Sequence, residues 1–169
     1  MIVCETERLR LRHFSLDDAE FIVRLLNVPS FIENVGDKGV HTLDDARAYL
    51  LDGPLASYER FGFGLNRVEL KHTAVPIGMC GLLKRDALDD ADIGYALLPE
   101  YWSNGFAIES AGAVLNAAKT TFGLKRVLAV VNPGNEISIR LLERLGFRYE
   151  RMVWLNEGEP GTMLYGTNF

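Results

Sequence analysis

The chain has 169 residues and a net charge of −5, and apolar residues make up 48% of it. This is the size and composition of one soluble domain with a substantial core, and no apolar run approaches the roughly 20 residues of a membrane span. The acidic balance argues against a nucleic-acid groove, which needs a basic face. Cys4, Cys80 and three scattered histidines lack the spacing of a disulfide framework or a metal site, so we expect no metal. The start of the chain lacks the pattern of a signal peptide, and we expect a cytoplasmic monomer or homodimer.

The first elements follow from periodicity and capping. Arginines alternate with leucines over Glu7–Phe14, which predicts a strand with one wet face. Ser15 and Thr42 each precede acidic residues and an apolar stripe, so each is expected to cap a helix. The segment Phe31–His41 is expected to be a loop, and the Gly53-Pro54 pair is expected to break or kink the second helix.

The rest of the chain predicts strands separated by two helices. Strands are expected at 61–70, 75–84, 92–98, 126–131, 147–155 and 162–167, and a long amphipathic helix at 107–122. Asn135 is expected to cap a short helix with Ile137 and Leu141 facing inward. The order of elements predicts a single α/β (α+β) domain around a mixed sheet.

One junction has the character of an anion site. The strand that ends at Pro99 is followed by a short loop and by a helix that begins near Gly105 and Ala107. Such a junction aims unpaired backbone N–H groups at one point, and small residues let a phosphate approach them. The loop has neither the Walker A pattern nor the dinucleotide glycine pattern.

Two separated segments resemble a known family. The stretch Ile93–Ala111 (IGYALLPEYWSNGFAIESA) resembles the acetyl-CoA signature of GNAT-superfamily N-acetyltransferases. The stretch Asn132–Phe147 (NPGNEISIRLLERLGF) and the opening Thr6–Arg12 (TERLRLR) are similar to the branch that includes the ribosomal-protein Ser/Ala N-terminal acetyltransferases. The resemblance implies a single GNAT-like domain over 1–169 with an acetyl-CoA-binding core at about 92–147. It also implies a mixed, mostly antiparallel seven-stranded sheet flanked by about four helices.

The resemblance assigns roles residue by residue. The implied acetyl-CoA contacts are the main chain of Leu97 and Leu98 for the pantetheine arm, the amides of Asn104, Gly105, Phe106 and Ala107 with Ile108 for the pyrophosphate, Asn135 for the pantetheine, and Ser138 beside the thioester sulfur. Ser138 is also the expected catalytic acid. Trp102 replaces a Gln or Arg that many members carry, and Asn104 stands where a basic residue is common.

The pKa values of amines narrow the choice of acceptor. An α-amine has a pKa near ~8 and a lysine amine near ~10.4, so deprotonating the former at neutral pH is easier by roughly 3 kcal/mol. The only candidate bases are Asp92, Glu100, Glu157 and Glu159, and a site without a strong base suits an α-amine. We therefore expect transfer from acetyl-CoA to the N-terminus of a protein or peptide. A small amine (amino sugar, polyamine or amino acid) is the alternative acceptor, and a non-catalytic acyl-CoA sensor is the alternative class. The acceptor pocket is expected at Phe31–Gly39 and the Asn156–Gly161 loop.

Overall fold

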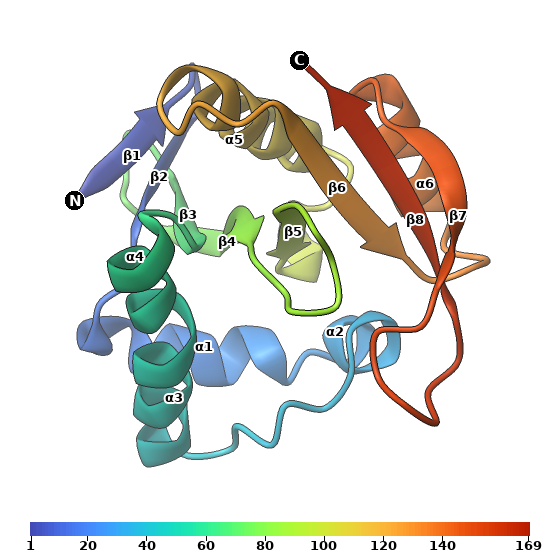
Figure 1. Cartoon of the computed structure of the whole chain (residues 1–169). Coiled ribbons are helices and arrows are strands. Elements are labelled where there is room, and N and C mark those ends of the chain that lie inside the picture. Colours follow the sequence, from blue (N-terminus) through green and yellow to red (C-terminus); the bar gives the residue numbers. More distant parts are fainter.

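The computed structural model describes residues 1–169, and its eight strands form one sheet in the order β1-β2-β3-β4-β5-β6-β8-β7 (Figure 1). The strands are β1 (Ile2–Glu5), β2 (Leu9–His13), β3 (Leu65–Leu70), β4 (Pro76–Leu83), β5 (Asp92–Leu97), β6 (Arg126–Val131), β7 (Arg148–Val153) and β8 (Thr162–Asn168). The helices are α1 (Ala19–Leu26), α2 (Pro29–Asn34), α3 (Leu43–Leu50), α4 (Ala56–Phe61), α5 (Phe106–Thr120) and α6 (Glu136–Arg144). All neighbouring strands are antiparallel except β5 and β6, which confirms the mixed, mostly antiparallel sheet.

The structure has eight strands and six α-helices, more than the seven strands and about four helices predicted from the sequence. The additional strand is β1, whose four residues pair with β2 but carry no alternation that would set them apart from an ordinary chain start. Part of the expected loop at Phe31–His41 is helical, because α2 begins at Pro29, a residue suited to the first turn. The chain remains helical at Gly53-Pro54, where a break or kink was expected. A π-helical turn over Leu51–Leu55 accommodates the proline and connects α3 to α4.

Helices cover both faces of the sheet (Figure 1). On one face, Ala111 and Leu115 of α5 and Leu142 of α6 belong to a single core cluster with residues of the sheet. On the other face, Ile22 of α1 and Leu50 of α3 belong to a second cluster. The sheet is therefore buried on both sides near its centre, where β4 and β5 lie.

The two parallel strands β5 and β6 are paired only near their starts. Asp92 is opposite Leu128, and the Leu128 N–H donates to the Ala91 carbonyl at 2.9 Å. No later residue of β5 pairs with β6. Towards Leu97 the strands diverge, and the outward peptide groups of β5 lack a neighbouring strand. This divergence leaves an open strand edge in the middle of the sheet.

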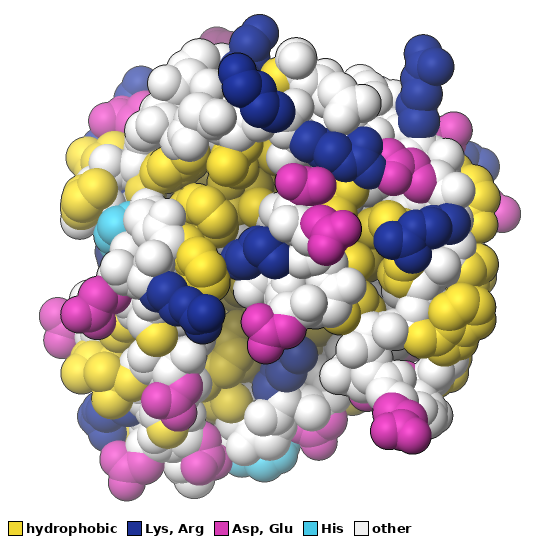
Figure 2. Space-filling model, in the orientation of Figure 1, with side chains coloured by type: hydrophobic (Ala, Val, Ile, Leu, Met, Phe, Trp, Pro, Cys, Tyr) yellow, Lys and Arg dark blue, Asp and Glu magenta, His cyan; other side chains and the backbone are white.

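The surface carries charges of both signs. Figure 2 shows acidic and basic side chains interspersed on the face that it draws. None of the helices has the length and apolar character required to cross a bilayer.

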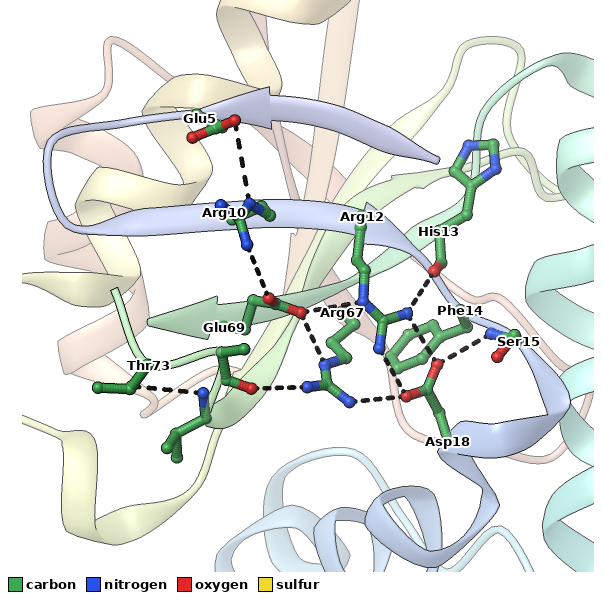
Figure 3. A network of polar contacts seen from close by, with 12 residues as sticks. Glu5, Arg10, Arg12, His13, Phe14, Ser15, Asp18, Arg67, Glu69 and Thr73 are labelled. Carbon is green, nitrogen blue, oxygen red and sulfur yellow. Dashed lines mark hydrogen bonds and ion pairs between the residues drawn. The ribbon is translucent and has the colours of Figure 1, made fainter. Parts of the chain in front are cut away.

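The arginines of β2 contact buried acids instead of forming a wet face (Figure 3). Asp18 and Glu69 are both 3% exposed. Arg12 Nη2 lies 3.0 Å from Asp18 Oδ1, and Arg12 Nε lies 2.9 Å from Glu69 Oε1. Arg67 of β3 reaches the same Asp18 oxygen at 2.8 Å. The alternation over Glu7–Phe14 did predict the strand, but its polar side is a partly buried ionic network in which the acids are buried.

Asp18 also links this network to the start of α1. Its carboxylate accepts from the Ser15 N–H at 2.9 Å in a capping box. Burial raises the pKa of the Asp18 carboxyl, but hydrogen bonds from Arg12, Ser15 and Arg67 outweigh burial and lower the pKa overall. The ionised carboxylate is therefore the form that the fold stabilises.

Replacing Asp18 by Ala should lower the free energy of unfolding by about 3–5 kcal/mol, because Arg12 and Arg67 would lose a buried counter-charge. Urea denaturation at pH 7 measures this loss. A depressed folded-state pKa stabilises the protein above the unfolded pKa of about 3.9, so the difference from wild type should shrink as the pH falls below about 4. The control is Asp44→Ala, which removes an exposed acid paired with Arg47 and should cost less than about 1 kcal/mol. Equal losses in the two variants would contradict a special role for Asp18.

Candidate functional site

The turn before α5 has the backbone geometry of an anion site. Ser103 and Gly105 have φ of +62° and +79°, both in the left-handed region. The first helical bond of α5 runs from the Glu109 N–H to the Gly105 carbonyl at 3.1 Å, so the three preceding N–H groups have no partner within the helix. Left-handed residues that alternate with helical ones turn successive N–H groups towards one side, which forms a concave anion-binding nest. The predicted pyrophosphate residues 104–108 are therefore consecutive around one concavity.

Two side chains that the sequence analysis noted only as departures hold this turn in place. The Trp102 indole N–H donates to the Leu97 carbonyl at 3.0 Å, which ties the turn to the end of β5. The Asn104 amide donates to the Trp102 carbonyl at 2.9 Å. Both side chains therefore support the backbone of the turn, while its N–H groups remain for a ligand. Ser103, in a strained left-handed conformation that non-glycine residues rarely adopt, was not singled out from the sequence.

Glu109 anchors the first turn of α5 to the β1–β2 turn. Its carboxylate accepts from the Thr6 hydroxyl, from the Arg8 N–H at 3.2 Å and from Arg8 Nε at 2.7 Å. Partial burial raises the pKa of Glu109, but the bonds from Thr6 and Arg8 outweigh it and lower the pKa overall. Glu109 therefore has a structural role, because it fixes the turn to a segment about 100 residues away.

The open edge of β5 presents Leu97 and not Leu98. The Leu98 N–H, part of the main chain expected to bind the pantetheine arm, donates instead to the Ile77 carbonyl of β4 at 2.8 Å. Peptide groups alternate in direction along a strand, so those of Leu97 point away from β4 and towards the divergence from β6. The Leu97 carbonyl already accepts from Trp102, which leaves the Leu97 N–H as the donor on the open edge. Leu98 itself is buried beneath the helices of the opposite face.

The second motif faces the same opening. Asn135 caps α6, and its Oδ1 accepts from the Ser138 N–H at 3.3 Å. Its side-chain NH₂ group is then the part that can donate to a ligand. Burial raises the pKa of the Tyr95 hydroxyl, and a hydrogen bond with the Ser138 side chain opposes that effect. Tyr95 belongs to β5 and Ser138 to α6, so the two side chains come together only in the folded chain.

One inward prediction for α6 was wrong. Ile137 is 82% exposed, because Leu142 is the residue that α6 buries and Ile137 lies outside that stripe. The exposed Ile137 side chain stands in the first turn of α6, between the capping residue and Ser138.

The four candidate bases are not equivalent. Asp92 begins β5, five residues and about 16 Å from Leu97, where it is buried and paired with Arg85 at 3.1 Å. Burial raises the Asp92 pKa and Arg85 opposes the rise, but its position removes it from the open end. Glu100 pairs with Arg24 at 2.7 Å on the surface.

The segments expected to line an acceptor pocket lie at the open end of β5 and β6. The Asn132 amide, just after β6, donates to the Asn34 carbonyl at the end of α2 at 3.0 Å. Val131 pairs with Met163 at the start of β8, so the β7–β8 loop that contains Glu157 and Glu159 is at this same end. The Asn156 amide donates to Glu159 at 2.9 Å within that loop.

Comparisons with known proteins agree with this arrangement. The sequence model of the Acetyltransferase (GNAT) domain matches residues 8–148, which include both motifs. YoaA, an N-acetyltransferase of Bacillus subtilis (strain 168), is 32% identical over 168 residues that cover 98% of this chain and 93% of that protein.

Solved structures extend the agreement to the fold. An acetyltransferase from Agrobacterium tumefaciens str. C58 superposes with a TM-score of 0.82 at 24% identity, covering 98% of this chain and 94% of that one. RimL, a ribosomal L7/L12 alpha-N-protein acetyltransferase in complex with coenzyme A, superposes with a TM-score of 0.82 at 16% identity, covering 99% and 98%. At these identities the similarity is one of fold.

Replacing Gly105 by Glu should weaken coenzyme A binding by roughly 100-fold or more, because like charges about 4 Å apart near a protein surface repel by several kcal/mol. Isothermal titration calorimetry measures the affinity. The matched control is Gly123→Glu, at the other end of α5, where φ is +64° and no atom lies within 4 Å of an added Cβ. Both variants carry the left-handed backbone cost of roughly 1–2 kcal/mol, and their melting temperatures measure any further effect of Arg8 Nη2, which lies 3.3 Å from a Cβ at Gly105. Normal binding by Gly105→Glu would show that the turn is not the phosphate site.

Proposed function

This chain belongs to the GNAT family of acetyltransferases, and we propose that it acetylates the N-terminal α-amine of a protein or peptide. As a member of the family it is an acetyl-CoA-dependent N-acetyltransferase. The proposal concerns the acceptor and the residues that carry the reaction, and it extends to a single acetyltransferase domain over 1–169 with its cofactor core at about 92–147.

The absence of a buried base at the open end carries the acceptor proposal. Asp92, the buried member of the four candidates, lies at the opposite end of β5. Glu100 is held by Arg24, and Glu157 and Glu159 are exposed on a loop, where a carboxylate acts on an amine only through water. A site without a buried base favours an amine that loses its proton readily near neutral pH. An α-amine does so more readily than a lysine side chain.

The geometry suits the cofactor. Gly105 has no side chain to hold a pyrophosphate away from the N–H groups of residues 104–108, and its left-handed backbone turns those groups outward. The open edge at Leu97 offers one peptide N–H, and Asn135 offers an amide NH₂. We assign the pyrophosphate to the turn, the pantetheine arm to Asn135 and the other outward peptide groups of β5, and the thioester carbonyl at its end to the Leu97 N–H.

Acetyl transfer then needs little from the protein. The neutral amine attacks the thioester carbonyl carbon, a C–N bond forms, the C–S bond breaks, and the amine proton leaves to water. The Leu97 N–H stabilises the negative charge that develops on the carbonyl oxygen. The Ser138 hydroxyl passes a proton to the departing thiolate while it takes one from solvent, so that no alkoxide is left behind. Because a thiol has a pKa near ~8.5, this proton is helpful but not indispensable.

A panel of acceptors tests the proposal. Thiol release from acetyl-CoA should be fastest with short peptides that have a free N-terminus, and it should disappear when the N-terminus is blocked even if a lysine is present. Initial rates should rise with pH through the α-amine pKa of about 8. Faster turnover of a polyamine, amino sugar or free amino acid would replace the peptide acceptor by a small molecule. Tight binding of coenzyme A with no turnover on any amine would indicate a sensor.

Replacing Ser138 by Ala should lower kcat by roughly 10- to 100-fold, because a general acid usually contributes about 100-fold or more and this leaving group needs little help. The affinity for coenzyme A should change by less than about twofold. Single-turnover kinetics and calorimetry measure the two quantities. The control is Thr120→Ala, which removes an exposed hydroxyl at the far end of α5 and should change neither. An unchanged kcat in Ser138→Ala would remove Ser138 from the reaction.

A further inference from the structure

We propose that a small cavity beneath the C-terminal half of α5 binds one ordered water molecule, which donates a hydrogen bond to Asn66 Oδ1 and forms a second one with the imidazole of His13. The cavity lies where β2 ends and β3 begins, beside Leu82, which pairs with Ile93 near the start of β5. The opening between β5 and β6 lies at the other end of β5. The water site is therefore separate from the proposed cofactor and acceptor sites.

The cavity has the size of a single water molecule. Its volume is about 10 Å³, and one buried water needs roughly 10–15 Å³. Two of its walls are the rings of Phe63 and Phe122, which pack edge to face with their centroids 5.7 Å apart. Most of the other wall residues are apolar as well, so the few polar groups decide what the cavity holds. The lining residues are Val3, His13, Phe63, Gly64, Asn66, Leu82, Val114, Ala117 and Phe122.

Asn66 supplies a buried acceptor to the cavity. The residue lies on β3 and is only 5% exposed. Its Nδ2 donates to the Cys80 carbonyl of β4 at 3.2 Å, but its Oδ1 is buried and has no hydrogen-bond partner in the protein. Leaving a buried acceptor unpaired destabilises a fold, and native structures rarely do so. The Oδ1 atom therefore calls for a donor, and the cavity that Asn66 lines has the room for one.

His13 is the second polar side chain on the cavity wall. It is the last residue of β2, and its ring stacks on Tyr58 with the centroids 3.6 Å apart, which fixes the plane of the imidazole. Burial and the nearby N-terminal charge lower the pKa of His13, so the ring is neutral at pH 7 and has one donor and one acceptor nitrogen. Buried waters make about two to four hydrogen bonds, and Asn66 and His13 together offer two.

The water fits the cavity better than the two alternatives. Cavities that stay dry are lined by apolar groups alone, whereas this one has a buried oxygen without a partner on its wall. A larger ligand exceeds the volume. The water also has a place in the fold, because it connects β2 to β3 beneath Val114 and Ala117 of α5, the helix whose first turn forms the proposed phosphate site.

Replacing Val114 by Ile tests the proposal through the sign of a change in melting temperature. The variant adds one methylene group to a side chain that lines the cavity. If a water is bound there, the added group displaces it and leaves Asn66 Oδ1 unpaired, so the melting temperature should fall by about 2–5 °C. If the cavity is dry, the same group gains contacts and the melting temperature rises. A rise would overturn the proposal.

The matched control is the same substitution in an Asn66→Leu background, where an apolar group of similar shape replaces the amide. Val114→Ile should not lower the melting temperature there, because no acceptor is left to lose its partner. An equal fall in both backgrounds would assign the effect to crowding and would count against the water.

A crystal structure of the wild-type protein at about 1.5 Å resolution provides a direct readout that does not depend on either variant folding. It should show a water within about 3.2 Å of Asn66 Oδ1. A dry cavity, or an Asn66 amide turned so that Oδ1 accepts from a protein donor, would overturn the assignment.

Discussion

The divergence of β5 from β6 is the constraint on which the rest of the site depends. The two strands share one bridge at Asp92 and Leu128, and beyond it each follows a different neighbour. β5 remains bonded to β4, while β6 is paired along its length with β8. A continuous sheet would satisfy the outward peptide groups of β5 and leave no place for an extended ligand. Because the strands are parallel, both connections that follow them, the turn before α5 and the loop before α6, emerge at the open end.

The turn before α5 shows how a strained backbone is kept in place. A left-handed non-glycine residue such as Ser103 costs of order 1–3 kcal/mol and persists only when its surroundings determine it. Two hydrogen bonds hold this turn in place. The Trp102 indole N–H donates to the Leu97 carbonyl, and the Glu109 carboxylate accepts from Thr6 in the β1–β2 turn. The same groups that fix the turn leave its N–H groups unpaired, which preorganises the turn for the anion that we propose it binds.

Much of the architecture could be predicted from the sequence where the signal is local. The period of α5, the apolar run of β6, and the caps at Ser15, Thr42 and Asn135 each depend on neighbouring residues, and the structure has all of them. The features that escaped prediction depend on residues far apart in the chain. β1 exists because β2 is beside it, and the buried arginine network exists because Asp18 and Glu69 meet the polar side of β2.

The site divides in the same way. Gly105, Asn135 and Ser138 could be chosen from two short motifs, because the resemblance to the family implies a role for each by its position. That Asp92 is not the catalytic base could not be predicted from the sequence, because only the sheet shows that it lies at the end of β5 away from the opening. That Leu97 presents an open N–H and Leu98 does not likewise became clear only from the bond between the Leu98 N–H and the Ile77 carbonyl.

The anchoring of α5 by Glu109 has a consequence for how the protein comes into being. Glu109 and Arg8 are 101 residues apart, and Asn132 and Asn34, which meet at the other side of the opening, are 98 apart. Contacts of such separation form late and slow the folding of a chain, since the loops they close are long. A nascent chain can therefore build helices and hairpins well before it has a working cofactor site. Once the site exists, a bound cofactor stabilises only molecules in which the first and the middle thirds of the chain have already met.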